Sequence, residues 1–86
     1  MSYKLSAKDK ITVINQHLRN LWFTKYNYEI GILESSVSDK VDQKQIESDK
    51  LKMSEIERKC AILEKEIEEL KKIQEVEELE EEETNG

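Results

Sequence analysis

Apolar residues recur every three and four positions along much of this chain, in a heptad that begins at Ile11 and keeps its register to Glu77. This spacing lines one stripe of an α-helix, and the stripe needs a partner helix to bury it. No segment alternates apolar and polar residues as a strand would, so the pattern predicts an all-α protein. The stripe is apolar at both ends of the chain and polar in the middle. One set of heptad positions comprises Ile11, Leu18, Lys25, Ile32, Asp39, Ile46, Met53, Cys60, Ile67 and Gln74, and the other comprises Ile14, Leu21, Tyr28, Ser35, Asp42, Asp49, Ile56, Leu63, Leu70 and Glu77.

The helix boundaries follow from local signals. Ser6 and Asp9 form a capping-box pattern, which predicts a first helix over 7–34 after a lead over 1–6. Gly31 and the serines that follow it lower helix propensity, so we predict a turn over 35–38. A second helix is predicted over 39–76. The run of glutamates over 77–86 repels itself and is predicted to be a disordered acidic tail.

Three pairings of these helices compete. In a parallel dimer of one long helix, Lys25 and three seam aspartates would each face their own copies, which is destabilising. An antiparallel dimer of one long, continuous helix avoids this clash, and so does a hairpin that folds back on itself. The two antiparallel forms use the same contacts, within one chain or between two.

A fold about Val37 matches the two halves layer by layer. It places Lys25 opposite Asp49, a complementary pair, and pairs apolar residues in the other layers from Ala7 with Ile67 to Tyr28 with Ile46. We therefore predict an antiparallel helical hairpin, with the dimer of long helices as the alternative. The predicted hairpin seam consists of Ile11, Ile14, Leu18, Leu21, Lys25, Tyr28, Ile46, Asp49, Met53, Ile56, Cys60, Leu63 and Ile67.

The first predicted helix has more apolar residues than one seam uses. A second stripe of large side chains follows it on the face opposite the seam, with a tryptophan at the seam's edge. Exposed patches of this kind mark protein–protein contacts, and aromatic residues dominate interface energetics. Two hairpins joined there would form a dimeric four-helix bundle. The predicted interaction face consists of Trp22, Phe23, Tyr26, Ile30, Leu33 and Val37.

Composition and charge limit the classes of partner that this chain could bind. The 86 residues suffice for one small domain, 40% of them are charged and the net charge is −6. Residues 1–40 hold six basic and four acidic side chains, giving +2, whereas residues 41–86 hold eight and sixteen, giving −8. This balance argues against direct nucleic-acid binding and against a membrane-bound helix, and no apolar run is long enough to span a bilayer. With a single cysteine and no signal-peptide pattern, we expect a cytoplasmic protein.

Candidate chemistry is sparse. His17 and Cys60 lack an orienting third group, and Cys60 is expected in the seam as a small apolar residue. Metal-ligand spacings and glycine-rich phosphate loops are absent from the sequence, so we predict no catalytic residues, no metal and no cofactor. The sequence favours a non-enzymatic, homo-oligomeric assembly or adaptor subunit of a coiled-coil type. The alternative is a small acidic regulator that binds and blocks a basic partner protein.

Overall fold

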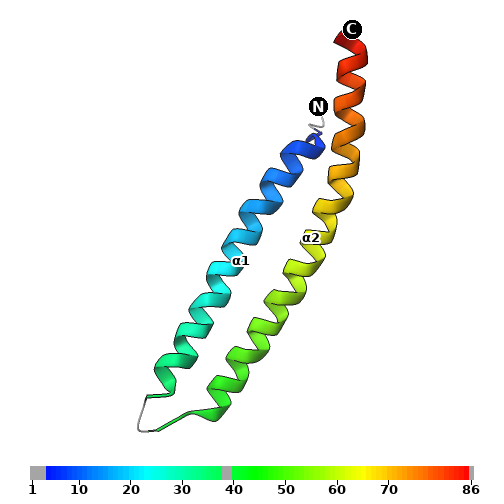
Figure 1. Ribbon diagram of the computed structural model, residues 1–86. Coiled ribbons are helices and arrows are strands. Elements are labelled where there is room, and N and C mark those ends of the chain that lie inside the picture. The colour runs from blue at the N-terminus through cyan, green and yellow to red at the C-terminus, as the bar shows by residue number, and fades with distance from the viewer. Residues whose placement is uncertain (1–3, 38–39, 86) are drawn as a thin grey trace.

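The chain forms an extended antiparallel pair of helices (Figure 1). The computed structural model describes residues 4–37 and 40–85, with side chains as far as residue 80. Helix α1 spans Ala7–Ser35 and α2 spans Gln43–Asn85, and the described residues contain no strand. The molecule measures 70 × 24 × 18 Å. The predicted all-α hairpin is thus confirmed as a fold; residues 1–3 of the predicted lead, residue 38 of the turn, residue 39 of the second helix and residue 86 of the tail lie outside the described residues.

The start of α1 is held by groups from both helices. The Ser6 hydroxyl accepts a hydrogen bond from the Asp9 backbone N–H at 3.1 Å, as an N-cap does. The Ala7 backbone N–H donates to the Glu77 carboxylate at 3.3 Å. A carboxylate at this position also interacts favourably with the positive end of the helix dipole. Residues seventy positions apart in sequence therefore close the open end of the hairpin.

The connection between the helices is longer than predicted. The predicted turn over 35–38 and helix start at 39 differ from the structure, in which residues 36–42 lie between α1 and α2. Asp42 explains the later start, because its side chain accepts from the Gln45 N–H at 3.2 Å and its carbonyl accepts from the Ile46 N–H at 3.1 Å. Asp42 is therefore the N-cap of α2. At the other end, the Ser36 hydroxyl donates to the Leu33 carbonyl at 2.7 Å and helps to finish α1.

The predicted disordered tail over 77–86 also differs from the structure, since α2 continues through Asn85. Glutamate and leucine are good helix formers, so local propensity supports this extension despite the charge repulsion. Glu77 is anchored on α1, and Gln74 donates a side-chain hydrogen bond to Glu78 at 3.2 Å. These contacts stabilise the helix around residues 77 and 78, where repulsion between glutamates alone had predicted disorder.

The core is a single stripe between the helices. Its most buried members form one cluster, in which Cys60 is only 2% exposed. Every predicted seam residue lies at least half-buried, although the sequence analysis omitted Leu70, which is 4% exposed. The central cluster consists of Leu18, Ile56, Cys60 and Ile67, with Ile11, Ile14, Leu21, Tyr28 and Leu63 packed against it.

The register between the helices is one heptad away from the predicted one. A fold about Val37 requires facing residue numbers to add to 74, with Lys25 opposite Asp49. The Lys25 ammonium instead lies 2.9 Å from the Glu57 carboxylate. A Cβ on Gly31 would lie 3.9 Å from the Asp49 side chain, so Asp49 packs beside the end of α1. In these two contacts and in that between Ala7 and Glu77, the residue numbers add to between 80 and 84.

The physical reason for this shift is burial at the open end. The predicted register would have left Leu70 beyond the start of α1, whereas the observed one buries it. Burying a leucine side chain is worth about 1.5–3 kcal/mol. The shift costs no buried charge without a partner, because the Gln45 amide donates to the Asp49 carboxylate at 3.0 Å. The longer connection provides the residues that the shift requires.

The ion pair in the seam provides a test of the register. We expect Lys25→Glu to lower the free energy of unfolding, and Glu57→Lys in the same chain to recover about 0.2–1 kcal/mol, the usual coupling of a partly exposed pair. The measurement is a double-mutant cycle from urea unfolding followed by circular dichroism. The control cycle pairs Lys25→Glu with Asp49→Lys, for which we expect no coupling. A larger coupling with residue 49 than with residue 57 would support the fold about Val37 instead.

Candidate protein interface

The face of α1 turned away from the seam carries a set of exposed large apolar side chains. Phe23 and Tyr26 are each 59% exposed, Leu33 is 65% exposed and Trp22 is 44% exposed. We call this surface the α1 outer face and define it by the six residues that the sequence predicted: Trp22, Phe23, Tyr26, Ile30, Leu33 and Val37. The structure places all of them on α1 or in the turn that follows it, with Ile30 half-buried and the others exposed. A single partner helix cannot cover both the seam and the opposite face, so α2 leaves this surface open.

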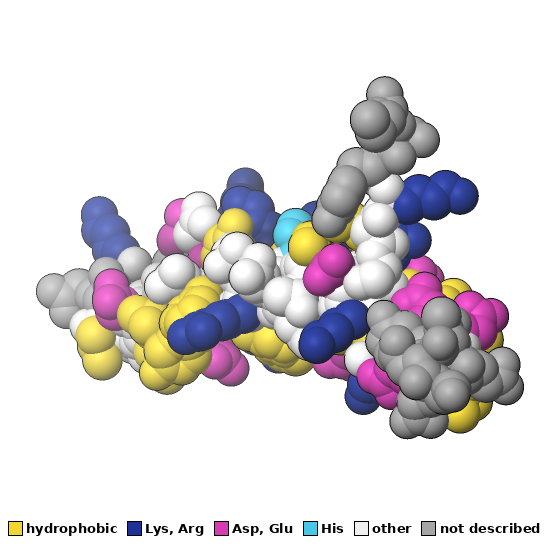
Figure 2. Space-filling model, turned by 90° about the horizontal axis from the view of Figure 1, so that it is seen from above, with side chains coloured by type: hydrophobic (Ala, Val, Ile, Leu, Met, Phe, Trp, Pro, Cys, Tyr) yellow, Lys and Arg dark blue, Asp and Glu magenta, His cyan; other side chains and the backbone are white. Residues whose placement is uncertain are grey.

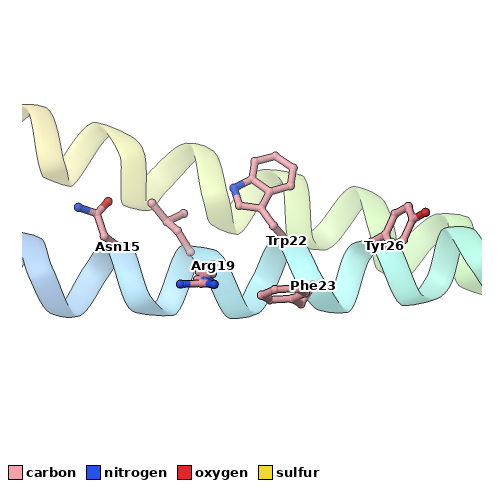
Figure 3. Close-up of a pocket in the computed structure, with 6 residues that line it drawn as sticks. Asn15, Arg19, Trp22, Phe23 and Tyr26 are labelled. Atoms are coloured by element: carbon pink, nitrogen blue, oxygen red, sulfur yellow. The ribbon is translucent and has the colours of Figure 1, made fainter.

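Part of the α1 outer face is hollowed into an open groove of about 560 Å³. Its lining includes Asn15 and Arg19, which the sequence analysis did not single out (Figure 3). In this view Trp22 projects to the side on which α2 lies and Phe23 lies along the opposite edge of α1. The spacing of residues could have predicted that Arg19 belongs to this surface, because it lies four residues before Phe23 on the same helical stripe.

Two cations lie against the aromatic rings. The Arg19 guanidinium carbon is 5.7 Å from the centre of the Phe23 ring, and the Lys25 ammonium is 5.1 Å from that of Trp22. Both separations are within the range of a cation–π interaction, worth about 0.5–1 kcal/mol at exposed sites. Lys25 also pairs with Glu57 of α2, so one lysine joins Trp22 to the seam. These contacts hold the rings and the charges in place within the hairpin.

Exposed apolar residues also occur on α2, where Ile73, Val76 and Leu79 follow one another at intervals of three, but α2 carries no aromatic residue. Leu51 and Ile62 are each 69% exposed and Ile73 is 50% exposed, spaced eleven residues apart. Eleven residues make about three helical turns, so the three share a stripe, and charged residues lie between them. The space-filling view shows hydrophobic patches divided by Lys, Arg, Asp and Glu side chains (Figure 2). Isolated surface apolar residues are common and need no partner; the clustered aromatics of α1 are the stronger candidate.

The two candidate reactive side chains, His17 and Cys60, differ in their exposure to solvent. Cys60 is buried in the core cluster, whereas His17 is exposed. Burial raises the pKa of the Cys60 thiol, the neighbouring Glu64 raises it further, and Lys25 opposes them. The thiol is therefore protonated at neutral pH and behaves as a small apolar side chain.

The described part of the chain contains neither a cluster of metal ligands nor a membrane-spanning helix. Residues 4–37 and 40–80 contain no group of three or more His, Cys, Asp or Glu side chains placed to share a metal ion. Neither described helix has the length and apolar character needed to cross a bilayer.

Comparisons of the chain with protein-family models, with curated proteins and with solved structures find no match.

The raised pKa of Cys60 predicts a pH dependence of stability. A thiol with a higher pKa in the folded state stabilises the fold fully below its ordinary value of 9.0, and this contribution is lost as pH rises above it. We expect the free energy of unfolding of the wild type to fall more steeply between pH 8 and pH 10 than that of Cys60→Ala. Urea unfolding under reducing conditions measures both, and the alanine variant cancels the titration of lysines and tyrosines. Parallel curves for the two proteins would show that burial does not perturb the thiol.

Proposed function

We propose that this protein is a non-enzymatic interaction module, an oligomeric helical hairpin that serves as an assembly or adaptor subunit. The observation that carries the proposal is the α1 outer face, on which a tryptophan, a phenylalanine and a tyrosine stand exposed within one and a half helical turns. Exposing such side chains costs solubility, and a contact that buries them recovers their apolar surface.

The rest of the hairpin supports this role. The core cluster already fills the seam between α1 and α2. Separating the two helices to expose the seam to a partner would therefore unfold the hairpin. The two helices form a rod 70 Å long that presents the α1 outer face along one side. A rigid helix face of this kind loses little conformational entropy on binding.

Replacing two exposed aromatics tests this function. We expect Phe23→Glu with Tyr26→Glu to lower the mass found by light scattering toward that of the 10.2 kDa monomer, because two charges would be buried in the contact. Helicity by circular dichroism should be retained, since both side chains are 59% exposed.

The matched control is Leu51→Glu with Ile62→Glu on α2, where both residues are 69% exposed. This variant introduces the same charge on the same scaffold, and we expect it to keep the wild-type mass. An aromatic variant that associates as strongly as the wild type would refute the proposed interface. Equal losses in the two variants would point to non-specific charge repulsion.

A second candidate function follows from the acidic half of the chain. Helix α2 runs past the start of α1 (Figure 1), and residues 41–86 carry a charge of −8. An acidic helix end of this kind suits a regulator that occupies a basic surface on another protein. Its support is weaker than that for the α1 outer face, because surface charge also serves solubility.

The two functions are separated by Glu75→Gln with Glu78→Gln, which removes two exposed charges and keeps the contact between Glu77 and Ala7. We expect this variant to keep the wild-type mass in light scattering. We further expect no specific binding of polylysine by either protein in calorimetry at about 0.15 M salt, where exposed charges are screened beyond about 8 Å. Tight binding by the wild type that the variant loses would favour the acidic regulator.

A further inference from the structure

We propose that the α1 outer face binds the same face of a second copy of this chain, with the two α1 helices antiparallel. This inference rests on the proposed function and specifies its partner. It follows from two properties of the surface: the spacing of its apolar residues, and the distribution of charge along α1.

The apolar spacing of the α1 outer face is self-complementary. Phe23, Tyr26, Ile30 and Leu33 follow one another at intervals of three, four and three, which is a coiled-coil seam separate from that of the hairpin. Run antiparallel, Phe23 of one copy faces Leu33 of the other, and Tyr26 faces Ile30. Each contact occurs twice about a two-fold axis near residue 28, as an isologous interface requires.

Residues at the two ends of this seam between copies also complement each other. Val37 of one copy then lies opposite Arg19 of the other, whose aliphatic stem is able to cover it while the charge stays in solvent. From Arg19 to Leu33 the contact covers about 21 Å of helix at 1.5 Å per residue, and Val37 follows in the turn beyond Ser35. A register shifted by one heptad would instead place Leu33 opposite Gln16, so the match selects one alignment.

Charge complementarity selects the antiparallel direction and a second copy. The part of α1 within the proposed contact begins with residues 19–28, which hold Arg19 and Lys25 and no acidic residue, for a charge of +2. The remainder, over 29–35, holds two glutamates and no basic residue, for a charge of −2. An antiparallel partner places the basic portion of each helix over the acidic portion of the other.

The specific pair is Arg19 of one copy with Glu34 of the other, repeated on both sides of the axis. Both side chains are exposed in the hairpin, and Arg19 already lies over the Phe23 ring at the edge of the proposed contact. A parallel pairing would place Arg19 beside Arg19 and Glu34 beside Glu34, with repulsion at both positions. The antiparallel pairing also sets the two helix dipoles in opposition, which is favourable.

Cross-linking at two matched positions tests the arrangement. Asn20 and Asn27 are exposed, lie one heptad apart and therefore occupy the same side of α1. In the proposed dimer the two copies of residue 27 are offset by about 3 Å along the axis, and the two copies of residue 20 by about 24 Å. With Cys60→Ala as background, we expect a short bismaleimide to link two chains of Asn27→Cys efficiently and those of Asn20→Cys at least tenfold less.

The outcomes separate this inference from the proposed function. Equal cross-linking at both positions, or none at either in a protein whose mass is dimeric, overturns the antiparallel arrangement and leaves an oligomeric module. A monomeric mass for the wild type at all concentrations overturns self-association, and with it this inference. The Cys60→Ala background must first show the same mass as the wild type in light scattering. A loss of association caused by unfolding of the background is then recognised before cross-linking.

A charge exchange gives a second measurement without new cysteines. We expect Arg19→Glu and Glu34→Arg each to weaken the dimer about fivefold in sedimentation, and the double variant to return to within about twofold of the wild type. In a parallel arrangement the double variant recovers nothing, because like residues still face each other. Failure of the double variant to recover affinity would therefore refute the proposed pair.

Discussion

The structure depends on one constraint: the apolar seam stripe of α1 can be buried from water against only one helix, α2. Burial of that stripe builds the core around Cys60 and sets the two helices antiparallel over most of their length. A helix in contact with only one neighbour keeps its opposite side in solvent. The exposed aromatics of α1 are therefore a direct consequence of a two-helix fold whose first helix is apolar on two sides.

Polar residues within the seam determine how the stripe is aligned. Lys25 sits in the core-facing row of α1 and reaches Glu57 at the edge, which satisfies its charge with one end near solvent. Asp49 is 8% exposed and is stabilised by Gln45 of its own helix. Neither charge is left without a partner, and both interrupt a seam that would otherwise slide between equivalent heptads. Closure by Glu77 on Ala7 and capping by Asp42 fix the two ends.

The same logic extends from the hairpin to its proposed assembly. The seam and the α1 outer face are two heptad stripes on one helix, the first satisfied within the chain and the second available between chains. Arg19 continues the outer stripe and Lys25 lies in the seam, and each is placed over an aromatic ring. A helix that carries two such stripes is suited to the centre of a bundle, and the uneven charge along α1 provides a direction for its partner.

The sequence by itself determined the helical class, the antiparallel pairing of its two halves, most of the seam and the outer stripe of α1, because these depend on periodicity and local propensity. It left open whether the two halves pair within one chain or between two. It also contained the cap at Ser6, a signal that acts within three residues. Only the tertiary structure decided the register. The Asp42 cap that lengthens the connection and the helix propensity that continues α2 past Val76 are local effects that the predicted bounds did not include. A heptad moved by seven residues presents the same pattern, so periodicity is blind to the shift that buries Leu70. The alignment came instead from contacts between residues far apart in the chain, of which Ala7 with Glu77 is the longest, and no local pattern encodes these.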